Sequence, residues 1–288
     1  MVSTIMLIQA IINGILLGGV YALMSIGLCL SFAVARVANS AHAAFAILSS
    51  FITYWLYTLL NLDPLLGTLV SAGILFPCGI MIQKTMLHRF IGKGPLMPFT
   101  FTFFLALALE NLMVILWGNK YRAIVVPYTA ASITIGEISI SALRLVAFIL
   151  SIVIAAILAL VVKYTYFGKA MRAVAQNREA AQLYGVSLER IYALTYGLTL
   201  MLAGVGGGLF SIIYPFYPSL QAAWIGLLYA VVIFGGLESP LGSFVAAMIM
   251  GVLTSVIGVI TQAMWGNVVM WIVVIIILLI KPSGLFGR

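Results

Sequence analysis

Residues that could act on a ligand are few in this chain: six acidic side chains, 14 Lys or Arg, two His and two Cys among 288 residues. Their spacing contains no HExxH zinc motif, no paired carboxylates and no Ser/His/Asp arrangement. The phosphate-binding pattern GxxxxGK followed by Ser or Thr is absent as well. We therefore expect no catalytic residue, no metal site and no cofactor. Any step driven by ATP must use a separate polypeptide.

Two groups of polar residues interrupt apolar runs, where they are candidates for a transport path or gate. Glu110 and Asn111 lie inside the run at residues 95–117, and an acid exposed to lipid is costly. Glu110 therefore either serves the function or bonds inside a bundle or near a helix end, and the sequence favours neither. Asn39 and His42 begin another apolar run, where we favour a structural or gating role over ligand binding.

The polar stretch GKAMRAVAQNREAAQLYGVSLERI, residues 168–191, holds four of the 14 basic and two of the six acidic residues. Asn177 is suited to cap a short helix whose first turn contains Glu179. Gly185 is suited to the left-handed residue that ends such a helix. The spacing predicts about two helical turns between these caps, with one face able to dock in a groove of a partner protein. That face consists of Ala180, Leu183 and Tyr184.

Membrane-spanning helices are the elements that must position these residues. The chain is 64% hydrophobic and 7% charged, with a mean hydropathy of +1.24, whereas a soluble domain is about half apolar and about a quarter charged. Several apolar runs exceed the ~18 residues that indicate a span. We expect an all-α polytopic membrane protein with one transmembrane domain over residues 1–288 and eight or nine spans. The expected spans cover residues 5–35, 38–60, 65–83, 95–117, 142–162, 191–213, 222–234, 244–261 and 268–280.

The choice between eight and nine spans depends on residues 222–243, where a short apolar run precedes GGLESPLGS. Irregular backbone at membrane depth is tolerated only inside protein or along a cavity. This segment is therefore a candidate for a broken or re-entrant helix. Residues 118–141 differ, because ASITIGEISIS alternates in a way that predicts a short hairpin or an extended loop outside the membrane.

Basic residues are distributed unevenly between alternate loops. With nine spans and the N-terminus outside, 11 of the 14 Lys and Arg fall on one side, the exceptions being Lys120, Arg122 and Arg144. Cytoplasmic loops carry the excess of Lys and Arg, so we expect the loop at about 164–190 and the C-terminus in the cytoplasm. This distribution accounts for the net charge of +8 without nucleic acid, which we exclude as a partner.

Several motifs resemble known transport proteins. Glu179-Ala180-Ala181 followed by Gly185 resembles the EAA loop of ABC importer permeases, although no Ile-x-Leu-Pro follows it. The wider pattern resembles the permease of branched-chain amino acid (Liv-type) ABC importers. Its matching segments are RVANSAH at 36–42, GKAMRAVA at 168–175, FGGLESPLG at 234–242 and KPSGLFGR at 281–288. Glu238 stands where that family usually has glycine.

The resemblance implies a permease in a bacterial inner membrane, acting with ABC ATPase subunits, a second permease (itself or a homologue) and an extracytoplasmic substrate-binding protein. ATP would be used by the partner subunit. The ATPase-docking residues that it implies are Arg172, Asn177, Arg178, Glu179, Ala180, Ala181, Leu183, Tyr184 and Gly185. The expected residues of the substrate path or gate are Asn39, His42, Glu110, Asn111, Gly235 and Gly236.

Other interpretations stay open at this point. An ion-coupled secondary transporter would carry charges and broken helices at the membrane midplane, where Glu110 is the plausible acid. A purely structural membrane subunit would show no transport activity of its own. The substrate is also open, between branched-chain amino acids, other amino acids, and urea or short amides.

Overall fold

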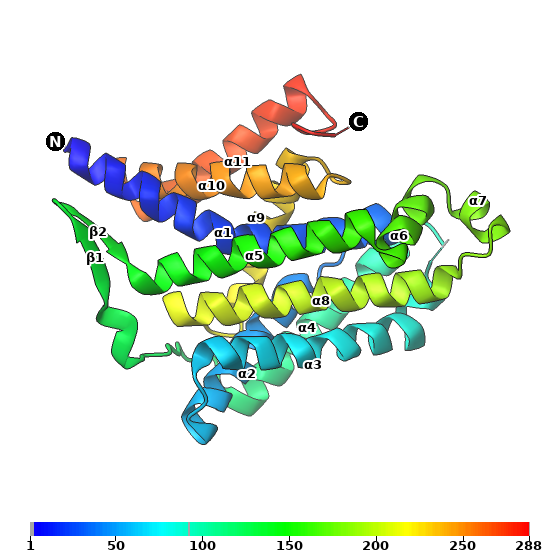
Figure 1. The fold of residues 1–288 in the computed structure, drawn as a ribbon, viewed down its shortest axis with the longest axis horizontal. Helices are drawn as coiled ribbons and strands as arrows, with labels where there is room; N and C mark the ends of the chain where they lie inside the picture. The colour runs from blue at the N-terminus through cyan, green and yellow to red at the C-terminus, as the bar shows by residue number, and fades with distance from the viewer. Residues whose placement is uncertain (1–2, 92, 288) are drawn as a thin grey trace.

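The computed structural model describes residues 3–91 and 93–287, which form a bundle of long apolar helices (Figure 1). The helices are α1 (Thr4–Ala35), α2 (His42–Leu60), α3 (Pro64–Thr85), α4 (Leu96–Trp117), α5 (Ala142–Tyr164), α6 (Tyr166–Gln176), α7 (Arg178–Leu183), α8 (Leu188–Ile213), α9 (Leu220–Gly235), α10 (Pro240–Ile260) and α11 (Ala263–Ile280). Strands β1 (Ser132–Ile135) and β2 (Ile138–Ser141) pair as an antiparallel hairpin, and 3-10 turns lie at Leu87–Arg89 and Pro127–Ala130.

Seven of the described helices are long and apolar enough to cross a membrane, and two shorter apolar helices lie at Leu220–Gly235 and Val268–Ile280. These helices confirm the prediction of a polytopic all-α membrane protein. The eight or nine spans stay a prediction, since they require one or both of the shorter helices to cross. α1 has 32 residues, a length of about 48 Å at ~1.5 Å per residue, so it exceeds the ~30 Å hydrocarbon core.

Local sequence signals set several helix ends. Asp63 begins α3 by accepting a hydrogen bond from the backbone N–H of Leu65 at 2.9 Å. Ser239 begins α10 in the same way, with the N–H of Gly242 donating to its Oγ at 3.0 Å. Both helices continue with proline, which lacks the N–H that a first turn leaves unpaired. Asn61 ends α2 in a left-handed conformation at φ 52°.

The centre of the bundle consists of α1 and α8. In each of these helices 83% of the residues in the apolar 18-residue stretch are buried, against 17% in α4 and in α5. Small residues allow this packing: a Cβ on Gly14 would lie 2.6 Å from the Cα of Val252, and one on Gly207 would lie 1.9 Å from the Ala46 carbonyl oxygen. α4 and α5 expose most of their apolar side chains, as expected of helices that face lipid or another subunit.

The irregular backbone inside the bundle lies at residues 36–41, between α1 and α2. Arg36 ends α1 with φ 56°, and α2 begins at His42, four residues later than the predicted start of this span at residue 38. The Cε1 of His42 lies 3.0 Å from the position of a Cβ on Gly27, so α2 starts beside the interior of α1 and not beyond its end.

Side chains from other helices satisfy the backbone of this segment. Ser31 donates to the Val37 carbonyl at 3.1 Å, and Thr102 of α4 accepts from the Ser40 N–H at 3.1 Å. Such irregular backbone is tolerated because it is buried in protein. In the segment predicted to be broken or re-entrant, residues 222–243, the 16-residue α9 is joined to α10 by a turn. α9 is shorter than the helices that are long enough to span, and a re-entrant path for it stays a prediction.

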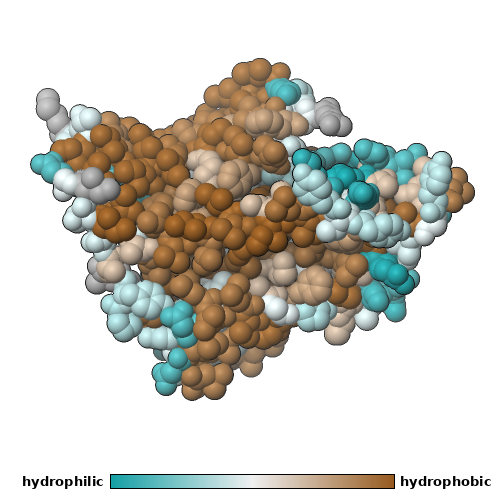
Figure 2. Space-filling model, viewed as in Figure 1, coloured by the Kyte–Doolittle hydropathy of each residue, from teal (hydrophilic) through white to brown (hydrophobic). Residues whose placement is uncertain are grey.

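The two ends of the bundle differ (Figure 1). The hairpin and the start of α1 lie at one end, called here the hairpin end, and α6 and α7 project from the other, called here the α7 end. The predicted hairpin is confirmed, with Gly136 in its turn at φ 61° and Gln9 of α1 bonded twice to the backbone of Ser139 at 2.7 and 3.0 Å. Figure 2 shows an apolar band over the middle of the bundle and polar colouring over α6 and α7.

Candidate functional site

α6 and α7 form a helical projection at the α7 end. Thr165 begins α6 by accepting a hydrogen bond from the Gly168 N–H at 3.1 Å. Ala170, Met171 and Val174 then face the bundle and are buried. This helix was missed from the sequence, where only the second helix of the loop was predicted. The threonine cap and the spacing of these three apolar residues are the signals that could have found it.

α7 has the caps that the sequence predicts. The Asn177 Oδ1 accepts from the Ala180 N–H at 3.0 Å, and Gly185 follows the helix at φ 80°. The N–H of Val186 donates to the Ala181 carbonyl at 3.1 Å and that of Gly185 to the Gln182 carbonyl at 2.9 Å. This pair of bonds is a Schellman motif, in which glycine avoids the clash that a Cβ meets in a left-handed conformation.

Two large apolar side chains are exposed at the C-terminal end of α7, beside polar ones. Leu183 is 88% and Tyr184 90% exposed, whereas Ala181 on the other side is 4% exposed and packs into the core. Most other large exposed apolar residues lie on the spanning helices, where lipid can cover them. Leu183 and Tyr184 instead lie on the polar projection. An exposed apolar pair at that position is a candidate contact for a partner protein.

The charged residues of the projection divide into two groups. Arg178 and Glu179 are exposed on α7. Arg172 of α6 donates from Nη1 to the Val162 carbonyl at 2.8 Å and from Nη2 to the Lys163 carbonyl at 3.3 Å. Its cation therefore satisfies the C-terminal carbonyls of α5 and joins α6 to that helix. A docking role for Arg172 and the other residues of the predicted set stays a prediction.

A buried polar cluster lies where α2 begins. Asn39 and His42 are both 0% exposed, and Tyr196 of α8 is 2% exposed. The His42 ring lies beside the backbone of Met24, and the Tyr196 hydroxyl lies beside the Asn39 side chain. Even so, Asn39 Nδ2, both His42 nitrogens and the Tyr196 hydroxyl complete no hydrogen bond of normal geometry within the described part of the chain.

Unpaired polar atoms in a core are costly and require a reason. These atoms lie at the N-terminal end of a helix that starts inside the bundle, where backbone N–H groups add partial positive charge. In membrane transporters, helix ends that lie inside the bundle can form ligand sites or gates. The structure thus brings Asn39 and His42 together with α8. A gating role for them stays a prediction.

The glycine turn between α9 and α10 contacts the same region of α1. The Sγ of Cys29 donates to the Leu237 carbonyl at 3.4 Å. Cys29 lies two residues after Gly27, which adjoins His42. A Cβ on Gly235 would lie 2.5 Å from Gly242, and one on Gly236 would lie 2.7 Å from Gly287. These glycines therefore allow close backbone packing, and their role in the substrate path or gate stays a prediction.

The last residues of the described chain cover this turn. The N–H of Leu285 donates to the Phe234 carbonyl at 2.8 Å, and that of Phe286 donates to the Gly235 carbonyl at 3.1 Å. Arg36, at the end of α1, forms an ion pair with Glu238 in the turn. Sequence reasoning did not pair these two residues, since 202 positions separate them.

The polar pair on α4 is placed apart from this cluster. Glu110 accepts a hydrogen bond from Nε2 of Gln221, a residue of α9, at 2.7 Å. Asn111 is exposed, and its amide donates to the Leu107 carbonyl of its own helix at 2.8 Å. Thr102 of α4 contacts the segment before α2. Glu110 lies eight residues further along α4, which places it about 12 Å from Thr102 at ~1.5 Å per residue. The structure therefore joins Glu110 to α9 and not to Asn39 or His42.

The fold and these sites define a class of protein: a polytopic membrane protein with two buried helices, α1 and α8, at its centre and a helical projection at one end. The comparison with protein families is more specific. Residues 10–278 match the family described as "Branched-chain amino acid transport system / permease component". The chain belongs to this family of transmembrane permeases, as its motifs suggested.

Individual relatives agree with the family. The chain is 24% identical to the "High-affinity branched-chain amino acid transport system permease protein LivH" of Salmonella typhimurium, over 98% of this chain and 96% of that protein. Identity to the BraD permease protein of Pseudomonas aeruginosa is 24% with the same coverage. It is 27% to a probable LivH of Methanocaldococcus jannaschii, over 96% and 91% of the two chains. No solved structure matches this chain.

Proposed function

We propose that this chain is the permease subunit of an ATP-driven importer of branched-chain or closely related amino acids. Family membership over residues 10–278 supports the substrate class. The missing phosphate-binding motif supports a separate ATPase. The observation that carries the proposal is the apolar tip of α7, Leu183 and Tyr184, 88% and 90% exposed on a polar projection.

Docking of α7 in a groove of the ATPase would cover this tip. Burying one such side chain stabilises an interface by about 1.5–3 kcal/mol. The exposed charges of Arg178 and Glu179 would then lie at the rim of the contact, where charges contribute to orientation and rate more than to affinity. ATP-driven closure of two ATPase subunits would move α7 as a unit, because caps at both ends hold its shape.

A path for coupling leads from α7 into the bundle. On one side Arg172 joins α6 to the end of α5, and on the other Gly185 and Val186 connect α7 to α8. α8 carries Tyr196 and Thr199, and the Thr199 hydroxyl donates to the Gly27 carbonyl of α1 at 3.1 Å. A displacement of α8 would therefore reach the buried cluster at Asn39 and His42. We propose that this cluster opens and closes in alternating access.

The proposed orientation places the α7 end in the cytoplasm. Three Lys or Arg residues belong to the hairpin end, and the other 11 belong to loops and tails that alternate to the opposite side. Arg288, one of those 11, lies outside the described residues. The N-terminus would be outside and the C-terminus in the cytoplasm of a bacterial cell, with the protein in the plasma membrane.

Two further partners follow from this function. One permease supplies half of a pore, so we propose a second permease, either another copy or a homologue, against the outer apolar faces of the bundle. A substrate-binding protein would deliver the amino acid at the hairpin end. The remaining exposed apolar surface would contact lipid.

Reconstitution tests the function. The purified chain is placed in proteoliposomes with the ATPase, binding protein and second permease of its importer, and uptake of labelled leucine is measured. We expect uptake only with ATP and with all partners present. Uptake by this chain alone, driven by an ion gradient, would instead establish an ion-coupled transporter.

A further inference from the structure

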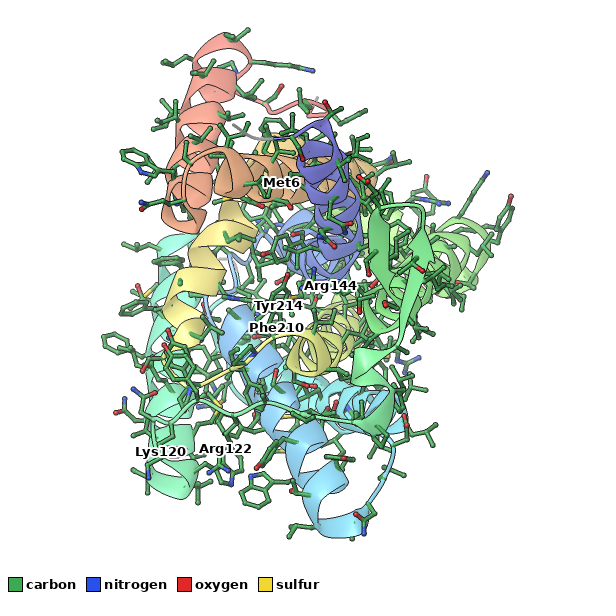
Figure 3. The ribbon with its side chains drawn as sticks, turned by 90° about the vertical axis from the view of Figure 1, so that its left-hand side faces the viewer. Met6, Lys120, Arg122, Arg144, Phe210 and Tyr214 are labelled. Carbon is green, nitrogen blue, oxygen red and sulfur yellow. The ribbon has the colours of Figure 1, made fainter. Side chains whose placement is uncertain are left out.

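A pocket of about 550 Å³ opens at the hairpin end, on the side opposite α7. It lies between the outer parts of α1, α5, α8, α9 and α10, and its volume is in the range of small-molecule sites. Figure 3 views this end directly, with Arg144, Phe210 and Tyr214 close together near its centre. Lys120 and Arg122 lie toward the edge in the same view.

Arg144 supplies the positive charge of this pocket. Its side chain is half-buried, Nη1 donates to the Asn13 Oδ1 at 3.2 Å, and the guanidinium lies 5.3 Å from the centre of the Tyr214 ring. No carboxylate lies within ion-pair distance of it in the described structure, where the ion pair found is Arg36 with Glu238. The Arg144 guanidinium thus has no acidic partner in the described structure, and it has five N–H donors to offer.

The position of Arg144 increases the positive potential of the pocket. It is the third residue of α5, so its charge lies in the first helical turn, where the helix dipole is also positive. A cation at this place is destabilising for the helix. A bound anion would offset both charges, and a planar carboxylate matches the guanidinium in a two-bond geometry.

Arg122 at the same end is engaged differently. It donates to the Trp117 carbonyl at 3.0 Å and stacks over Tyr54 and Trp55, at 5.2 and 5.3 Å from their ring centres. It does not line the pocket. Arg144 is therefore the guanidinium at this end that is presented to a ligand.

An aromatic wall completes the pocket. The rings of Phe210 and Trp224 are 4.1 Å apart, and Tyr21 contacts Trp224 edge-on at 6.0 Å. These rings offer apolar surface to a hydrocarbon side chain. Among the lining residues there is no Asp or Glu to hold an amine strongly. The lining therefore suits a molecule with one carboxylate and an apolar group.

We propose that this pocket is an outer binding site for the amino acid, in which Arg144 holds the α-carboxylate and the Tyr21–Phe210–Trp224 wall holds an aliphatic side chain. The site receives substrate before it reaches the gate at Asn39 and His42. This inference rests on the proposed import function and its orientation.

The test measures leucine uptake by the complete reconstituted complex carrying Arg144→Gln. Losing a charge-assisted hydrogen-bonded pair should raise the KM for uptake on the order of 10- to 100-fold. Arg144→Lys should restore part of the affinity, because it keeps the charge and loses the two-bond geometry. Lys120→Gln, which removes an exposed charge at the same end outside the pocket, is the matched control and should keep wild-type kinetics.

A second measurement does not depend on turnover. The complex without binding protein is titrated with leucine and with isopentylamine, which lacks the carboxylate, while tryptophan fluorescence is followed. Leucine should change the signal and isopentylamine should not, and Trp224→Phe should remove the response. Arg144→Gln should abolish the difference between the two ligands.

The outcomes separate the two claims. Absence of ATP-dependent uptake by the wild-type complex would overturn the proposed function itself. Normal wild-type uptake together with unchanged KM and unchanged ligand discrimination in Arg144→Gln would overturn the outer site alone. Loss of complex assembly in Arg144→Gln would leave the wild-type titration to decide, since an equal response to leucine and isopentylamine also contradicts a carboxylate site.

Discussion

Arg36 and Glu238 form an ion pair that joins the end of α1 to the turn between α9 and α10. Both side chains are more than half exposed, at 60% and 52%, so the pair contributes at most about 1 kcal/mol to stability. Its position is more informative than its energy. It links the segment that leads to the buried Asn39–His42 cluster with the glycine turn at the α7 end. We propose that it acts as a latch on the gate proposed at this cluster.

Breaking this pair should change transport more than stability. We expect Glu238→Gln to lower the thermal midpoint very little and to raise ATP hydrolysis in the absence of substrate, because the gate opens more readily. The exchange Arg36→Glu with Glu238→Arg should return hydrolysis toward the wild-type rate. If ATP hydrolysis without substrate in the exchange variant stays as high as in the single variants, the pair does not act as a latch.

Crowding the buried cluster should impair transport. A Cβ on Gly27 would lie 3.0 Å from the His42 ring and 3.1 Å from the Thr199 carbonyl oxygen. Gly27→Ala should therefore destabilise the protein by about 1–3 kcal/mol and slow uptake. Gly73→Ala is the control, since a Cβ there would meet nothing within 4 Å. Thermal unfolding and uptake are compared for the two, and equal behaviour would contradict a tightly closed cluster.

Glu110 distinguishes the two transport mechanisms. Its bond to Gln221 is made to a neutral amide, so Glu110→Gln should keep a hydrogen bond and leave ATP-driven uptake within about twofold. Gln221→Leu should reduce uptake and stability more, because Glu110 then loses its buried hydrogen-bond partner at a cost of about 1–3 kcal/mol. Complete loss of uptake in Glu110→Gln with normal expression would favour an ion-coupled role for this acid.

Local signals were sufficient for some of these features. Asn177 and Gly185 act within a few residues of their own position, so capping rules predicted both ends of α7. The spans were predictable because lipid requires long apolar runs, and the hairpin because its strands alternate.

Other features depend on partners that are distant in sequence. The backbone just before α2 is bonded by Thr102, which lies on α4. Glu110 is paired with Gln221, 111 residues away, so its role was not readable from its own span. The pocket around Arg144 is assembled from five helices, and in the sequence Arg144 contributed only to the count of charges.

The docking role of α7 is the central claim, and its apolar tip can be removed without changing the backbone. Leu183→Ser with Tyr184→Ser replaces two side chains that are 88% and 90% exposed, so the permease itself should fold normally. Val125→Ser, which alters a 72% exposed residue near the hairpin end, is the matched control.

The decisive measurement is co-purification of the ATPase with each permease variant, together with ATP-driven leucine uptake. We predict that Val125→Ser retains both and that the double α7 variant loses ATPase binding and at least 90% of uptake, about a tenfold effect, which corresponds to ~1.4 kcal/mol. Wild-type ATPase binding and uptake by the double variant would contradict the account.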